Sequence, residues 1–239
     1  MDTLPWIRLN SKVQFTNTRK LFFNNYLYRI KFNVPGGRIA KNHPPELVGH
    51  QIETRIKFDQ IIRDIHPGSW RKKELDNIEV SQVEWWSRLF GENPNLFYRV
   101  EEPYISVYSN DINELYLMFS EEPFLPNSLL SVSAPESKET EQLLLEGKII
   151  VKRIPGYTHV VYFRECWDDN NAEAKLAILN YLQSLGDQIR MPRSTVNALK
   201  TRWGTRGYFY CSDPAIATFI SLIYPGIIGK IFPLEHLSE

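Results

Sequence analysis

The sequence has few of the features that mark exported, membrane or disulfide-rich proteins. It contains only two cysteines, Cys166 and Cys211, among 239 residues, too few for a zinc site of their own or for a disulfide framework. No apolar run approaches the roughly 20 residues of a membrane-spanning helix. The N-terminus also lacks the apolar segment of a signal peptide. We therefore expect a soluble, cytoplasmic protein in a reducing compartment, with no membrane contact.

An excess of one charge is also missing. Lysine plus arginine and aspartate plus glutamate number 28 each, so the formal net charge is zero. Such a chain has no global basic field of the kind that draws histone-like proteins to nucleic acid. Any anionic partner must therefore be bound by a local group of basic side chains.

The motifs of several common enzyme chemistries are absent. The chain has no glycine-rich loop of the Walker or dinucleotide type, no Gly-x-Ser-x-Gly elbow and no His-hydrophobic-His pair for a metal. The acidic pairs Glu101-Glu102 and Asp168-Asp169 lie beside turns, where solvated carboxylates are typical. We therefore predict no metal, no cofactor and no catalytic residue, and we expect a non-enzymatic protein.

A strand, an aspartate and a helix occur twice in the chain, about a hundred residues apart. Residues 104–111 and 207–213 are rich in β-branched and aromatic side chains, as strands are. Each ends at an aspartate, Asp111 or Asp213, after which apolar residues recur at helical spacing. These carboxylates can accept from the free amides of a first helical turn, so we predict that both are N-caps. The repeat predicts two tandem domains of similar plan.

The second copy has signals for a hairpin, a helix, two strands, a helix and a last strand. We place these elements at residues 148–153 with 157–164, 171–185, 196–203, 208–211, 214–223 and 227–232. The first copy has matching signals and a longer insertion, at residues 26–34, 79–90, 96–100, 104–109, 112–119 and 128–134. Strand, helix, strand, strand, helix, strand is the order of a split βαβ unit, the ferredoxin-like plan.

The fold class that follows is α+β, with two tandem ferredoxin-like domains and antiparallel sheets. We place the first domain at residues 1–135, a linker at 136–147, where glutamates, Pro135 and Lys138 cluster, and the second domain at 148–239. In each domain helices cover one face of the sheet, which leaves the other face open.

The open face of the second domain carries the candidate binding residues. The first and third strands are central in this plan, which brings Tyr162 beside Tyr208 and Tyr210. The stretch before the third strand is the densest mixture of basic and aromatic residues in the chain, with Lys200, Arg202, Trp203 and Arg206. Exposed rings on a sheet stack on unpaired bases, and basic side chains neutralise phosphates. The same tyrosines are also compatible with an internal packing role.

Arg206-Gly-Tyr-Phe-Tyr resembles the start of the third-strand signature of the RNA-recognition motif, in which a basic residue and a glycine precede alternating aromatics. It departs from that signature at Phe209, where the family has glycine or alanine. The tandem plan is also similar to that of the proteins that process CRISPR RNA, which implies a histidine as general acid or base. The candidates are His43, His50, His66, His159 and His236, and the glycine-containing loop would be residues 225–230.

Three functions remain open. The first is a single-stranded RNA- or DNA-binding accessory of a polymerase or nucleoprotein complex, in which the second copy binds because residues 104–111 have few basic neighbours in the sequence. The second is an assembly subunit that binds a protein partner, or a second copy of itself, through Trp85 or Trp86, which cannot both face one core. The third is a metal-independent RNA endonuclease.

Overall fold

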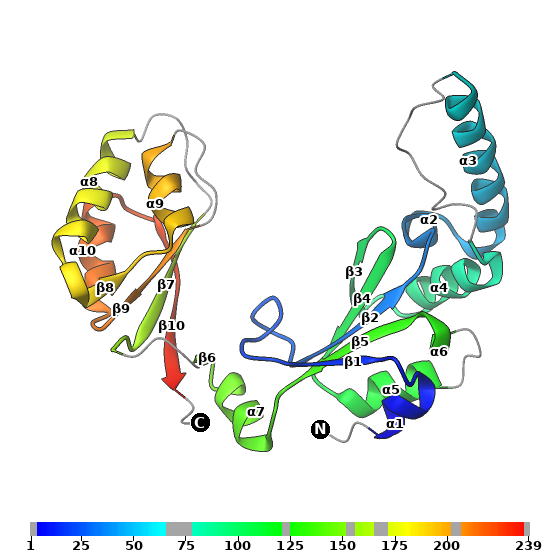
Figure 1. The fold of residues 1–239 in the computed structure, drawn as a ribbon, viewed down its shortest axis with the longest axis horizontal. Helices are drawn as coiled ribbons and strands as arrows, with labels where there is room; N and C mark the ends of the chain where they lie inside the picture. Colours follow the sequence, from blue (N-terminus) through cyan, green and yellow to red (C-terminus); the bar gives the residue numbers. More distant parts are fainter. Residues whose placement is uncertain are drawn as a thin grey trace. The chain divides into compact units, whose positions relative to one another are not determined.

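The structure is a computed structural model, and it describes residues 4–65, 78–120, 125–151, 156–164, 172–201 and 207–236. The chain divides into two compact units, Met1–Lys138 and Glu139–Glu239. Each unit contains one five-stranded sheet with helices beside it (Figure 1). The predicted α+β class with two tandem units is therefore confirmed.

The first sheet has the strand order β1-β5-β2-β4-β3. Its strands are β1 (Gln14–Asn17), β2 (Tyr28–Asn33), β3 (Phe97–Glu101), β4 (Tyr104–Ser109) and β5 (Leu129–Ala134). The helices of this unit are α1 (Leu4–Leu9), α2 (Gly37–Asn42), α3 (Pro45–Ile65), α4 (Val80–Glu92), α5 (Ile112–Ser120) and α6 (Leu125–Ser128). Strands β2 and β4, the first and third of the repeated plan, lie next to each other in the sheet interior, as expected.

The second sheet has the equivalent order, β6-β10-β7-β9-β8. Its strands are β6 (Ile149–Val151), β7 (His159–Phe163), β8 (Ile189–Arg190), β9 (Tyr208–Cys211) and β10 (Ile228–His236). The accompanying helices are α7 (Lys138–Leu145), α8 (Ala172–Ser184), the 3₁₀ turn η2 (Gly186–Gln188), α9 (Arg193–Lys200) and α10 (Ala215–Ile223). Among the described residues, no helix has both the length and the apolar character that crossing a membrane requires.

Each sheet has a fifth strand beyond the four of the predicted plan, and in the second sheet this strand, β6, lies within the predicted residues 148–153. Strand β1 pairs in parallel with β5, and β6 pairs in parallel with β10, so both sheets are mixed rather than wholly antiparallel. The added strand covers the outer edge of the last strand, whose amide and carbonyl groups would otherwise be unpaired. The predicted hairpin of residues 148–153 and 157–164 is wrong, because β10 lies between β6 and β7. A turn signal predicts that the chain reverses, but it does not determine which strands pair.

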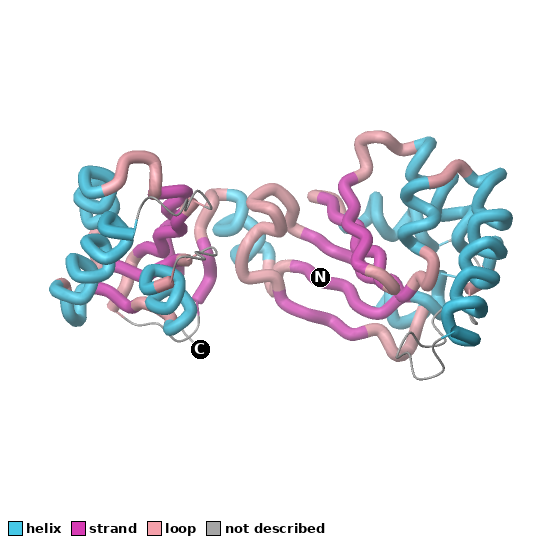
Figure 2. Tube along the Cα trace, turned by 90° about the horizontal axis from the view of Figure 1, so that it is seen from above, coloured by secondary structure: helices cyan, strands magenta, loops and turns pink. Residues whose placement is uncertain are grey.

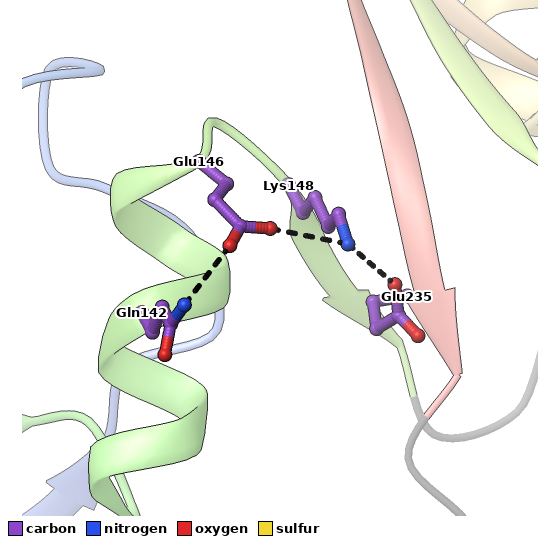
Figure 3. A network of polar contacts seen from close by, with 4 residues as sticks. All are labelled: Gln142, Glu146, Lys148 and Glu235. Atoms are coloured by element: carbon purple, nitrogen blue, oxygen red, sulfur yellow. Dashed lines mark hydrogen bonds and ion pairs between the residues drawn. The ribbon is translucent and has the colours of Figure 1, made fainter.

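A small ionic network joins the start of β6 to β10 (Figure 3). Lys148 Nζ lies 3.2 Å from Glu235 Oε2 and 3.3 Å from Glu146 Oε2, and Gln142 Nε2 donates to Glu146 Oε1 at 3.3 Å. Hydrogen bonds to the two carboxylates raise the pKa of Lys148. Because these groups are at least partly exposed to water, the network adds little to the stability of the unit.

The predicted strand at residues 196–203 is also wrong, because residues 193–200 form the helix α9. Thr195, Ala198 and Leu199 are buried at the three- and four-residue spacing of a helix. The strand that pairs with β9 on the side away from β7 is instead the two-residue β8. Beyond it, the Thr195 hydroxyl donates to the Tyr208 carbonyl at 2.8 Å and accepts from the Tyr208 amide at 3.0 Å. One side chain thus replaces the missing strand partner.

The two predicted N-caps are confirmed. Asp111 Oδ1 accepts from the amide of Asn113 at 2.8 Å at the start of α5, and Asp213 Oδ1 accepts from the amide of Ala215 at 2.8 Å at the start of α10. Pro214 already has helical torsion angles, φ −67° and ψ −16°, and as a proline it has no amide to leave unpaired.

Helices lie beside the sheet in each unit (Figure 2), and the side chains between helices and sheet are buried. In the first unit, Trp86 of α4 is fully buried, and its ring centroid lies 5.2 Å from that of Phe32 and 5.6 Å from that of Phe119. Trp85 is partly buried against Trp86, with 5.2 Å between their centroids. Of the two tryptophans predicted not to share one core, Trp86 is the one that fills the core of its own unit, so the partner contact stays a prediction for Trp85 alone.

Candidate nucleic-acid interface

The second unit has an aromatic surface on the side of its sheet away from the helices. Val161, Phe163, Phe209 and Cys211 belong to the buried core that packs against α8 and α10. Because side chains alternate along a strand, the tyrosines between them face the opposite side. Tyr162 lies directly opposite Tyr208 in the ladder, and both are partly exposed.

The rings on this surface form a continuous series. The centroids of neighbouring rings lie 5.8 Å apart for Phe232 and Tyr162, 5.5 Å for Tyr162 and Tyr208, 5.6 Å for Tyr208 and Tyr210, and 6.4 Å for Tyr210 and Tyr157. All five are partly exposed. We call Tyr157, Tyr162, Tyr208, Tyr210 and Phe232 the aromatic face.

The structure brings together three of the sequence-predicted residues, Tyr162, Tyr208 and Tyr210, and adds two that were missed. Phe232 was missed because it reaches the face only through the pairing of β10 with β7, where it lies opposite Val160. Tyr157 precedes β7, and its hydroxyl donates to the Ile189 carbonyl at 3.3 Å. In the sequence, Phe232 ends the apolar run predicted as the last strand. The sequence alone does not show which side chains of that strand lie beside Tyr162.

One described cation lies beside the aromatic face. Exposed Arg190, which the sequence did not single out, pairs with Tyr210 in the ladder and therefore shares its side of the sheet. Lys200, a predicted site residue, is exposed at the end of α9, and its neighbour Leu199 belongs to the core on the helix side of the sheet. The predicted residues Arg202, Trp203 and Arg206 lie outside the described residues.

Burial favours the neutral form of two tyrosines of the aromatic face, Tyr162 and Tyr210. Burial raises the pKa of Tyr210 to about 12, and a hydrogen bond and charge repulsion from Tyr208 add to the increase. Burial likewise raises the pKa of Tyr162. Neutral rings with hydroxyl donors do not repel phosphate, and their faces are free of charge that would oppose stacking.

The histidines lie in separate environments. His236 Nε2 donates to the Tyr157 carbonyl at 2.9 Å, and His159 Nδ1 lies 2.8 Å from the Thr158 hydroxyl. His43, with Lys41 and Arg88 among its neighbours, lines a cleft of about 490 Å³ in the first unit. His50 is a residue of α3, and His66 lies outside the described residues. Across the described ranges, no three His, Cys, Asp or Glu side chains gather as a metal site requires.

No protein-family model matches the chain, and no curated protein is detectably similar to it in sequence. The function must therefore be inferred from the chemistry of its surfaces. On the described surface of the second unit, the aromatic face combines rings in tilted and edge-to-face contact, hydroxyl donors and a neighbouring arginine. Groups of these kinds bind unpaired bases and phosphates in other proteins.

Proposed function

We propose that the protein binds single-stranded nucleic acid on the aromatic face, without itself being an enzyme. The observation that carries this proposal is the series of partly exposed rings from Phe232 to Tyr157 on the side of the sheet away from the helices. Each base stacked on such a ring contributes about 1 to 3 kcal/mol. Arg190 beside Tyr210 would contact a neighbouring phosphate.

A single strand suits this surface better than a duplex does. Bases within a duplex are already stacked and paired, so their faces are not offered to side chains. Duplex binding depends largely on neutralisation of phosphates by basic side chains. A chain with zero net charge has no general attraction for a duplex. The role we propose is that of an accessory protein that holds a single strand within a polymerase or other nucleoprotein complex.

The test is an anisotropy titration of the full chain with labelled oligo-dT and oligo-U at several salt concentrations. We expect Tyr208→Ala to weaken binding about 5- to 150-fold, the equivalent of one lost stacking contact. Tyr208→Phe keeps the ring and should bind nearly as the wild type does.

The matched control removes an aromatic ring elsewhere in the same unit. Phe219, on α10, is 57% exposed and is not part of the aromatic face. Phe219→Ala should leave affinity unchanged. Equal affinities for Tyr208→Ala and Tyr208→Phe, or no detectable binding by the wild type at low salt, would contradict the proposal.

A further inference from the structure

The first unit also has an open sheet face, but its chemistry is different. Ile30 and Phe32 of β2 are buried, and Phe32 packs on Trp86 and Phe119 on the helix side of the sheet. Alternation therefore places Arg29 and Lys31 on the opposite side. Both are partly exposed at the centre of the five-stranded sheet.

The strand register surrounds these cations with hydroxyl groups. Lys31 lies between Ser131 of β5 and Ser106 of β4, and Ser106 lies opposite Arg99 of β3. In the next row of the ladder, Arg29 lies opposite Ser133. We call this surface the polar face, and it consists of Arg29, Lys31, Arg99, Ser106, Ser131 and Ser133.

Arg29 and Lys31 keep their positive charge unneutralised. The Arg29 Nη2 group donates to Ser133 Oγ at 3.1 Å, whereas its buried Nε has no hydrogen-bond partner within the described residues. Lys31 Nζ lies 4.0 Å from the centroid of the Tyr104 ring. Among the described residues neither cation has a carboxylate partner, whereas Arg99 is paired with Glu101 at 2.7 Å. The face therefore has a net positive charge.

The spacing of the two cations suits a chain of phosphates. Residues two apart on one strand are about 6.6 Å apart, which is comparable with the distance between successive phosphates along an extended single strand. Ser131 next to these cations is partly exposed, and its hydroxyl is a neutral donor of the kind that nucleic-acid-binding proteins commonly use to contact phosphate oxygens. Ser106 and Ser133 are buried.

An exposed aromatic side chain lies at the end of the polar face. Phe23 is 49% exposed, and its centroid lies 4.9 Å from that of Phe97 and 5.1 Å from that of Tyr108, which is the ladder partner of Arg29. It belongs to a tight turn in which Phe23 and Asn24 have positive φ angles of 53° and 59°. The turn thus holds a ring beside the cations, where a base could stack.

We propose that the polar face is a second nucleic-acid contact, which binds the sugar-phosphate backbone of a single strand through Arg29 and Lys31. It is a different surface from the aromatic face and does not depend on it. Residues 104–111 have few basic neighbours along the chain, which favours the second copy as the binder when the sequence alone is considered. In the folded unit these neighbours come from β2 and β3, which flank β4.

The test uses the full chain and two labelled probes of equal length, oligo-dT and an abasic deoxyribose-phosphate strand. For the variant Arg29→Gln/Lys31→Gln, we expect the slope of log affinity against log salt to decrease by about 1.4 on both probes, because each single-strand phosphate contact contributes about 0.7. Lys31→Gln alone, which spares the partly buried Arg29, should decrease the slope by about 0.7.

The matched control is Arg55→Gln/Lys57→Gln, which removes two exposed cations of the same unit on α3. This control should leave both slopes unchanged. If Arg29→Gln/Lys31→Gln behaves like the control while Tyr208→Ala still weakens oligo-dT binding, the polar-face proposal is overturned and the aromatic-face proposal stands. If Arg29→Gln/Lys31→Gln decreases both slopes while Tyr208→Ala leaves oligo-dT binding unchanged, only the aromatic-face proposal is overturned. No binding of either probe by the wild type at low salt overturns both.

Discussion

The two units place different side chains at matching positions of the same ladder. Tyr108 and Tyr210 each lie three residues before the capping aspartate. Two residues earlier on the same strands, Ser106 pairs with Lys31 in the first sheet and Tyr208 pairs with Tyr162 in the second. The first face is therefore cationic and hydroxylic where the second is aromatic.

This difference shows which side of the sheet must have the same chemistry in both units. The helix side of each sheet must be apolar, because it forms the core, and both units satisfy this with residues such as Val107 and Phe209, which are fully buried. The open side has no such requirement. One backbone plan can therefore present phosphate-binding groups in one unit and base-stacking groups in the other.

The largest expected effect on nucleic-acid binding comes from placing residues of the polar face at the matching positions of the aromatic face. In Tyr162→Lys/Tyr208→Ser, affinity for oligo-dT should fall by about 1 to 3 kcal/mol for each stacked base that is lost. The salt slope should increase by about 0.7, because one new cation is available to a phosphate. Anisotropy titrations measure both quantities. Tyr162→Phe/Tyr208→Phe keeps the rings and is the control; a similar loss in that variant would show that hydroxyls, not rings, bind the strand.

A smaller effect, on stability, should distinguish β9 from β4. The outer partner of β9 is the two-residue β8, whereas the outer partner of β4 is the five-residue β3. Thr195→Val keeps the shape of the side chain but leaves the Tyr208 amide and carbonyl without the partner that the hydroxyl supplies. Because Thr195 is 1% exposed, water cannot readily replace it, and we expect a loss of about 1 to 3 kcal/mol.

Hydrogen exchange measures this loss directly. Amides of β9 should exchange faster in Thr195→Val, whereas amides of β4, which pairs with the five-residue β3, should not change. Thr195→Ser keeps the hydroxyl and should restore most of the protection. Unchanged protection of β9 would mean that this side chain does not replace a strand partner.

The smallest effect is a pH dependence confined to the aromatic face. The folded-state pKa of Tyr210, about 12, lies above its ordinary value of 10.0, so folding favours the neutral phenol. This contribution to stability is complete below pH 10 and is lost as the pH rises toward about 12. The difference in tyrosinate absorbance between the wild type and Tyr210→Phe should titrate near the higher value. A difference that titrates near pH 10 would contradict the burial of this hydroxyl.

Local signals predicted much of the fold and part of the candidate site. The caps at Asp111 and Asp213 follow from bonds between residues two or three apart, and the helix predicted at residues 79–90 is α4. The alternation of tyrosines in β9 likewise predicted which side chains share a face. Signals of this kind are contained within one element, so the sequence is sufficient to read them.

The remaining features depend on pairing between distant segments. The sequence predicts a strand at residues 196–203 because the short apolar pattern there suits either a strand or a helix, and only packing of α9 against the second core separates the two. Phe232 and Arg190 join the aromatic face through ladders with β7 and β9. Long-range pairing is selected by burial of the whole sheet, which no single segment encodes.

The sequence by itself determined the two repeated strand-cap-helix units and the alternation of their side chains, because capping and strand periodicity act between near neighbours. Only the tertiary structure decided that Lys31 lies beside Ser106 and Arg29 beside Ser133. It also decided that the tyrosines of β7 and β9 meet Phe232 of β10. The physical reason is that a sheet face is assembled across strands, so its chemistry depends on which strands are neighbours.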